Sequence, residues 1–200
     1  DIDHDGDLDV AAVKSDGQYA IWLENPGTLS VNWKMNLVGA TQPWMDRVAL
    51  TDISGDGRID FIATVERQDG TLADSLVWFE APSDPKHDPW GRHYIARHRS
   101  LNSMDVADVD GDGATDIVVA EHTDLQKNDG AVDNLTLVYL NKDQGRRWVP
   151  QVVERGPHSS HLGARLVDLN NDGLKEIVSI GWNQYQHVHL WSKTLHAHTN

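Results

Sequence analysis

An aspartate-rich decapeptide recurs four times along this 200-residue chain and restricts the possible folds more than any other feature. The copies are DIDHDGDLDV from Asp1, DISGDGRIDF from Asp52, DVDGDGATDI from Asp108 and DLNNDGLKEI from Asp168. Their starts lie 51, 56 and 60 residues apart. Repeats of this length are typical of proteins in which one supersecondary unit stacks on the next, so we expect a repeat architecture.

Each copy has oxygen-bearing side chains at positions 1, 3 and 5 and glycine at position 6, as calcium loops do. An EF-hand is excluded because no copy has a carboxylate at position 12; an acid stands at position 9 instead. Metal-free Asx turns remain an alternative, since Asp-Gly is common in turns. We expect up to four structural Ca²⁺ ions, with these ligands: Asp1, Asp3, Asp5 and Asp9; Asp52, Ser54, Asp56 and Asp60; Asp108, Asp110, Asp112 and Asp116; Asp168, Asn170, Asp172 and Glu176.

Short apolar runs of strand length flank the loops and predict an all-β fold. They follow the loops at 10–13, 61–65, 117–120 and 177–180, and precede three of them at 47–52, 105–108 and 164–168. Aromatic-containing runs come next at 19–26, 76–82, 135–141 and 187–193, and a fourth set lies at 33–38, 90–96 and 148–154. Four strands per repeat predict propeller blades, with repeats at approximately 1–46, 47–102, 103–160 and 161–200 in one partial propeller. The first repeat lacks its first strand and the last lacks its fourth, which leaves about three and a half to four blades.

The Asp-rich loop between the first two strands of each blade resembles the FG-GAP/VCBS repeat family of calcium-binding β-propellers, which includes the heads of integrin α-subunits. The resemblance implies seven blades, or eight in some relatives, with Ca²⁺ in these loops. The turns after the third strands resemble those of secreted bacterial members, which implies an extracellular or periplasmic location. We therefore expect the chain to be part of a larger propeller, with the remaining blades as its partners. Some relatives of this broad type are polysaccharide lyases or sugar dehydratases, and others are adhesion modules, so enzyme status stays open.

The composition argues against nucleic-acid ligands, membrane-spanning helices and disulfides. A net charge of −14, from 31 acidic and 17 basic residues, makes nucleic acid an unfavourable ligand. No apolar run approaches the roughly 20 residues of a membrane-spanning helix, and the absence of cysteine excludes disulfides. The chain begins at Asp1 inside a motif and shows no signal peptide, so we expect a mature fragment or a piece of a longer chain.

The repeats differ at the end of the blades opposite the loops, and we expect the function there. First strands begin and second strands end at this face, which also carries Arg47 and Glu66 and the long connections 67–75 and 122–134. The candidates for acid–base catalysis are His161, Glu121, His122 and Asp105. The candidates for ligand binding are Trp182, Arg67, Asp46, Lys14 and Asn183.

This mixture of carboxylates, imidazoles, a guanidinium and an indole predicts a carbohydrate ligand. The alternatives are a non-catalytic adhesion or protein-interaction module that uses the same face, and a structural fragment of a larger propeller enzyme. Trp182 has a second interpretation, as a packing residue between blades. Glu121 and His122 are adjacent, so on a continuing strand only one of them would reach the site. We expect His87, His93 and His98 to lie in solvent.

Overall fold

The computed structural model describes residues 1–14, 18–28, 31–41, 44–66, 72–122, 134–156, 161–181 and 184–192, and its regular elements in these ranges are all β-strands. They form four antiparallel sheets in chain order. Blade 1 is β1 (Val10–Val13), β2 (Tyr19–Glu24) and β3 (Lys34–Ala40); blade 2 is β4 (Met45–Thr51), β5 (Asp60–Val65), β6 (Ala73–Glu80) and β7 (Gly91–His98). Blade 3 is β8 (Leu101–Ala107), β9 (Asp116–Glu121), β10 (Asn134–Lys142) and β11 (Arg147–Gly156); blade 4 is β12 (His161–Val167), β13 (Glu176–Gly181) and β14 (Gln184–Trp191). The predicted all-β class is confirmed.

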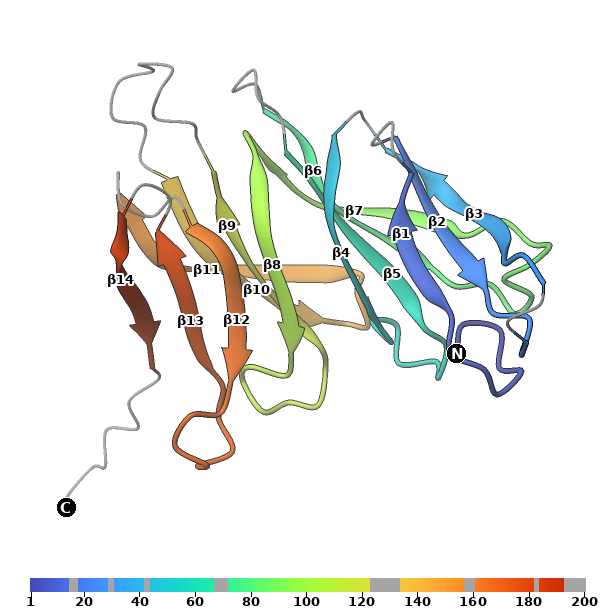
Figure 1. The fold of residues 1–200 in the computed structure, drawn as a ribbon. Helices are drawn as coiled ribbons and strands as arrows, with labels where there is room; N and C mark the ends of the chain where they lie inside the picture. The colour runs from blue at the N-terminus through green and yellow to red at the C-terminus, as the bar shows by residue number, and fades with distance from the viewer. Residues whose placement is uncertain are drawn as a thin grey trace.

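The four blades stand side by side in an open row (Figure 1). Contacts between blades join the first strands of neighbours, β1 with β4, β4 with β8, and β8 with β12. The four Asp-rich loops all lie at the lower edge of the molecule in Figure 1, and the starts of β4, β8 and β12 lie at the upper edge. The Asp-rich loops and the face at which the repeats differ therefore lie at opposite ends of the same strands. Among the described residues no helix is long and apolar enough to cross a membrane.

The hydrophobic core lies between blades because the middle strands bury both of their faces. Successive side chains of a strand point to opposite faces. In β5, Phe61 and Ala63 pack toward blade 1, whereas Ile62 packs toward blade 3. A strand that is covered on both sides needs a continuous apolar run rather than an alternating one, which explains the FIATV sequence at 61–65.

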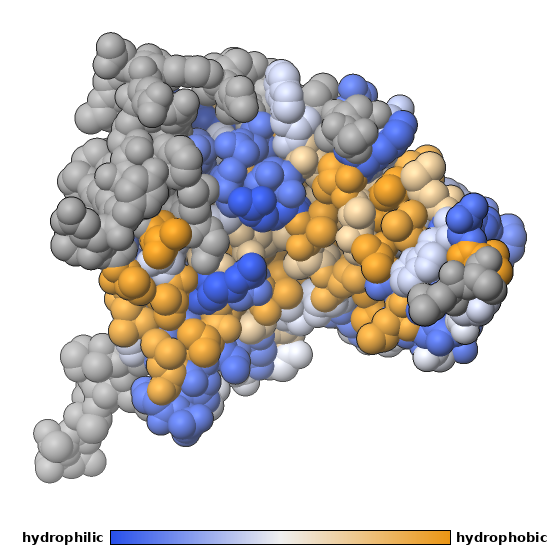
Figure 2. Space-filling model, in the orientation of Figure 1, coloured by the Kyte–Doolittle hydropathy of each residue, from blue (hydrophilic) through white to orange (hydrophobic). Residues whose placement is uncertain are grey.

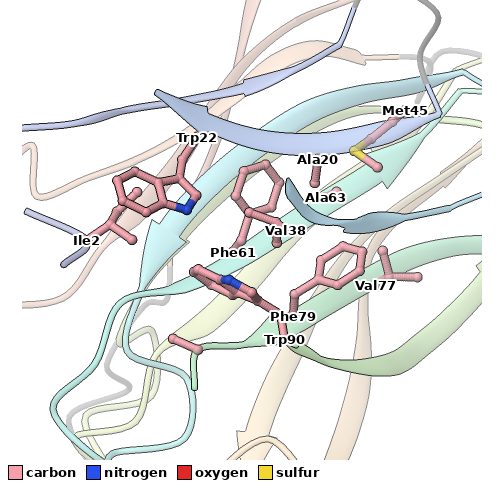
Figure 3. Packing of buried hydrophobic residues seen from close by; sticks show 11 residues of the cluster. Ile2, Ala20, Trp22, Val38, Met45, Phe61, Ala63, Val77, Phe79 and Trp90 are labelled. Carbon is pink, nitrogen blue, oxygen red and sulfur yellow. The ribbon is translucent and has the colours of Figure 1, made fainter. Parts of the chain in front are cut away.

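Aromatic side chains fill the contact between blades 1 and 2 (Figure 3). Phe61 and Phe79 meet edge to face, with ring centroids 6.3 Å apart, and Trp22 from blade 1 is fully buried beside them. Gly39 in β3 allows this close approach, because a Cβ atom there would lie 2.3 Å from the Phe79 ring. Blade stacking, rather than a single central core, therefore buries the apolar side chains.

Candidate functional site

The Asp at position 1 of each loop organises the loop backbone. Its Oδ2 atom accepts a hydrogen bond from the N–H of the glycine at position 6, over 3.1, 2.8, 2.9 and 3.0 Å in the four loops. That glycine has a positive φ, from +87° to +97°, in every loop. The left-handed conformation excludes most other residues, which explains why the Asp-Gly pair recurs.

Carboxylates converge in two of the loops. Oxygen atoms of Asp108, Asp110 and Asp112 lie within 4.8 Å of one another, and so do those of Asp1, Asp3 and Asp9. Three hard oxygen donors at this spacing fit Ca²⁺, which takes oxygen ligands at 2.3–2.6 Å. The second and fourth loops carry Ser54 and Asn170 at position 3, so a hydroxyl or amide oxygen replaces one carboxylate there. If the loops bind calcium as predicted, these two would bind it less tightly.

The acid at position 9 joins each loop to its sheet. Asp60 is fully buried; its Oδ2 accepts the N–H of Ile53 at 2.9 Å, and its Oδ1 accepts that of Ala81 at 2.8 Å. Asp116 accepts the N–H groups of Val109 and Asn141 in the same way. Burial raises the pKa of both carboxyls against the opposing effect of these hydrogen bonds. The position-9 side chains therefore have a structural role, and their role as metal ligands remains a prediction.

A polar cluster forms where two blades meet at the opposite end of the strands. We use this term for Asp46, Arg47, Glu66, Asn102 and His122. Arg47 donates to the side-chain oxygen of Asn102 at 3.0 Å, and the Asn102 amide donates to Glu66 Oε2 at 2.6 Å. His122 Nε2 lies 3.8 Å from Glu66 Oε1. From the candidate set, Asp46 thus pairs with Arg47 and His122 lies beside Glu66, and Asn102 links Arg47 to Glu66 across the two blades.

The Asp46 carboxyl in this cluster has a raised pKa. Its side chain is 24% exposed and forms an ion pair with Arg47, with Nη1 and Oδ2 3.2 Å apart. Burial raises the pKa of Asp46, and the nearby Glu66 raises it further, while the Arg47 charge acts in the opposite direction. A carboxyl whose pKa is raised beside a second carboxylate is typical of sites that hold and transfer protons.

Glu121 is buried in a second network and does not reach the open face. Its Oε1 atom lies 2.8 Å from His98 Nδ1, and His98 Nε2 lies 2.7 Å from the Tyr139 hydroxyl. Burial, with a smaller contribution from Glu121, raises the pKa of Tyr139 to about 12. The expectation that His98 lies in solvent is wrong: it is 5% exposed, because its ring packs between blades 2 and 3 against Tyr139.

The other candidates are dispersed. Asp105 lies within β8, where its Oδ2 accepts the N–H of Leu166 in blade 4 at 2.8 Å, and it therefore connects two blades. Lys14 follows β1, with its ammonium group 5.2 Å from the Tyr19 ring centroid. His161 begins β12 at the upper edge, although its side chain is outside the described part. Arg67, Trp182 and Asn183 lie outside the described residues.

Sequence reasoning missed Asn102, His98 and Tyr139 as members of these networks. A buried tyrosine hydroxyl usually has a hydrogen-bond partner, so the tyrosine in the apolar run 135–141 was a usable signal for one of them. No pattern in the sequence indicated that His98 or Asn102 would face the neighbouring blade, because blade packing brings them into contact with residues distant in the chain.

The comparisons with known proteins agree with this architecture. The model of the FG-GAP-like repeat family matches residues 1–63, 52–119 and 108–179, so the chain belongs to this family and the resemblance read from its loops is confirmed. The chain is also similar to aldos-2-ulose dehydratase from Phanerodontia chrysosporium, with 29% identity over 142 residues. That match covers 68% of this chain and 14% of the relative, so the chain spans a small part of its length.

Proposed function

We propose that this chain is a calcium-stabilised propeller segment that binds or acts on a carbohydrate through the polar cluster. The observation that carries the proposal is a chain of polar contacts across two blades: Asp46 pairs with Arg47, Asn102 links Arg47 to Glu66, and His122 lies beside Glu66. Fixed carboxylate, amide, guanidinium and imidazole groups offer donors and acceptors to the hydroxyl groups of a sugar. The long connections that follow Glu66 and His122 begin at the same edge.

The cluster also has the groups that proton-transfer chemistry requires. A carboxyl with a raised pKa can act as a general acid, and a neighbouring carboxylate or imidazole can act as a base. The similarity to a protein named as a sugar dehydratase supports this direction, since loss of water from a sugar needs one group to remove a proton and another to protonate the departing hydroxyl. An extracellular or periplasmic location is part of the proposal, because weak calcium loops of this kind need the higher calcium concentration found there.

The experiment is a glycan-binding and depolymerisation screen of the purified chain, with calcium and with chelator. Glu66→Gln and His122→Asn should each reduce binding or turnover at least tenfold without unfolding the protein. Glu80→Gln is the matched control, because Glu80 is a 40% exposed carboxylate paired with His93 at the loop end of blade 2. No binding by folded, calcium-loaded chain would reject the sugar proposal and favour the adhesion module.

A second candidate, a structural segment of a larger propeller, is favoured by the outer faces of blades 1 and 4. Met35 and Leu37 in β3 are 57% and 61% exposed, and Val188 and Leu190 in β14 are 69% and 55% exposed. Figure 2 shows hydrophobic surface near both ends of the row. The corresponding sheet faces inside the row are covered by a neighbouring blade, so we propose that further blades of a longer chain cover these two.

A further inference from the structure

In two of the four loops, a lysine from outside the loop binds the carboxylates that calcium would need. Lys142, at the end of β10, donates to Asp110 Oδ2 at 2.7 Å and also contacts Asp112 Oδ2. Lys86, in the connection between β6 and β7 of blade 2, reaches into blade 1, where its Nζ atom lies 2.5 Å from Asp3 Oδ2 and 2.8 Å from Glu24 Oε1. The two side chains are about one-quarter exposed, 26% for Lys86 and 25% for Lys142.

The lysines bind the oxygens that the loop backbone leaves available. Asp110 Oδ1 accepts the N–H of Asp112 at 3.3 Å, and Asp112 Oδ1 accepts that of Ala114 at 2.9 Å. The Oδ2 atoms of both residues take the lysine instead. The first loop has the same division, since Asp3 Oδ1 accepts the N–H of Asp5 and Asp3 Oδ2 faces Lys86. A metal ion that used these Oδ2 atoms would have to displace the ammonium group or lie beside it.

In the second and fourth loops, the position-5 carboxylate has a different kind of partner. In the second loop the cation on Asp56 Oδ2 is Arg58, a member of the loop itself. In the fourth loop the donor on Asp172 Oδ2 is the neutral amide of Asn170, at 3.0 Å. In the described part of the chain, an external ammonium group therefore lies on the first and third loops, the two whose carboxylates converge most closely. The lysines can thus be replaced without changing any expected metal ligand.

We propose that Lys86 and Lys142 are intramolecular counter-ions that compete with Ca²⁺ for the first and third loops. This inference rests on the calcium part of the proposed function. Each ammonium group offsets the repulsion among the clustered carboxylates when no metal is bound, and it lowers the calcium affinity of its loop because two cations within a few ångströms repel each other. At low calcium the lysines neutralise the loop carboxylates. Calcium binding at the first loop would break the contact of Lys86 that joins blades 1 and 2.

The test uses Lys142→Met and Lys86→Met, which remove the charge and keep most of the aliphatic stem. We expect calcium binding at one site to tighten at least fivefold in each variant, measured by isothermal titration calorimetry. The midpoint of thermal unfolding in chelator should fall in both variants, and calcium should restore it. Lys14→Met removes the same charge beside the Tyr19 ring, far from any loop lysine contact, and should leave calcium binding unchanged. Lys142→Arg keeps the positive charge and should bind calcium as the unchanged chain does.

Unchanged or weaker calcium binding in both Met variants, with calcium still bound by the unchanged chain, would overturn the counter-ion proposal and leave the calcium sites in place. If neither the unchanged chain nor any folded variant binds calcium, both proposals fail. If a Met variant does not fold in chelator, Lys142→Gln and Lys86→Gln provide the same comparison with a neutral polar side chain. The opposite signs expected for affinity and for metal-free stability distinguish a competing cation from a purely structural lysine, whose removal would not tighten binding.

Discussion

At the scale of single residues, buried carboxylates connect the loops to the blades. Asp60 accepts three backbone hydrogen bonds, from Ile53, Ser54 and Ala81. A buried carboxylate is tolerated when each of its oxygens has a partner. The loop entrance and the end of β6 are thereby held to the same side chain, which fixes the direction in which the position 1, 3 and 5 carboxylates point. The shape of the loop is thus set by contacts within the protein.

Asp46→Asn should increase stability at neutral pH. Because the folded state raises the pKa of Asp46, the native chain binds more protons than the unfolded chain between the ordinary value near 3.9 and the raised value. Its stability therefore falls as pH rises through that window. The substitution should raise the urea midpoint at pH 7 and leave it nearly unchanged near pH 4. A larger stabilisation at pH 4 than at pH 7 would contradict this assignment.

Gly145→Ala should destabilise blades 2 and 3 by about 2–4 kcal/mol, because overpacking adds to backbone strain. Gly145 has φ +79°, and a Cβ there would lie 2.7 Å from Ile53 Cγ2 and 2.8 Å from Trp78 Cζ2. Gly55→Ala is the matched control: its φ is +71°, but the nearest atom is 3.8 Å away. Chemical denaturation of both variants separates the cost of close packing from the cost of the positive φ. Equal losses would show that packing contributes nothing.

The turns of the Asp-rich loops could be predicted from the sequence, but the contacts that residues make between blades could not. Asp-Gly at positions 5 and 6 specifies a turn by local chemistry. The burial of His98 and the contact of Asn102 with Glu66 depend on how one blade sits on the next. The candidate residues at the upper face were therefore predicted as a set, but their partners were not. His122 lies beside Glu66 and Asp46 pairs with Arg47, while Glu121 turns inward to His98.

At the scale of elements, side chains that bond to the backbone of the next blade fix how neighbouring sheets stack. Asn141, at the end of β10, donates to the Ile53 carbonyl in blade 2 at 3.1 Å and accepts the N–H of Gly145 at 2.6 Å. Ser103 in β8 accepts the N–H of Ala164 in blade 4. These contacts connect strands that do not share a sheet, so they specify blade order in a way that apolar contacts alone do not.

Asn141→Ala should cost about 2–4 kcal/mol of stability, because it leaves two buried backbone groups without partners. Asn141→Asp keeps the acceptor for Gly145 but places a buried carboxylate oxygen against the Ile53 carbonyl, so it should be at least as destabilising as alanine at pH 7. Urea unfolding followed by tryptophan fluorescence measures the series. An alanine variant as stable as the unchanged chain would mean that water or another donor replaces these bonds.

Strand positions were predictable to within a few residues because the loops mark them. The run 61–65 became β5, and the run 117–120 lies inside β9. The irregular pairings were not predictable, such as the register shifts between Met45 and Val48 in β4 and between Leu101 and Ser103 in β8. Both shifts lie at the upper end of a first strand. They follow from how each strand bends toward its neighbour, which short-range sequence patterns do not encode.

At the scale of the whole molecule, the exposed outer faces make the chain prone to associate with other sheets. Large exposed apolar patches are rare on monomers and mark interfaces. Leu37→Glu combined with Val188→Glu should remove concentration-dependent self-association of the purified chain, measured by sedimentation velocity. Tyr94→Glu is a suitable control, because Tyr94 is 55% exposed in β7 rather than on an outer blade. Association that persists in the double variant would place the contact elsewhere.

We propose that the loops hold the blades together at one end and that the polar cluster binds a sugar at the other. The most direct measurement is the dissociation constant for a sugar ligand from the screen, together with the unfolding midpoint, in Glu66→Gln and Asp112→Asn. We expect Glu66→Gln to weaken sugar binding at least tenfold and to shift the midpoint little. We expect Asp112→Asn to lower the calcium-dependent midpoint and to leave sugar affinity unchanged while the protein is folded. Equal loss of sugar affinity in both variants would show that the two ends of the blades do not have separate roles.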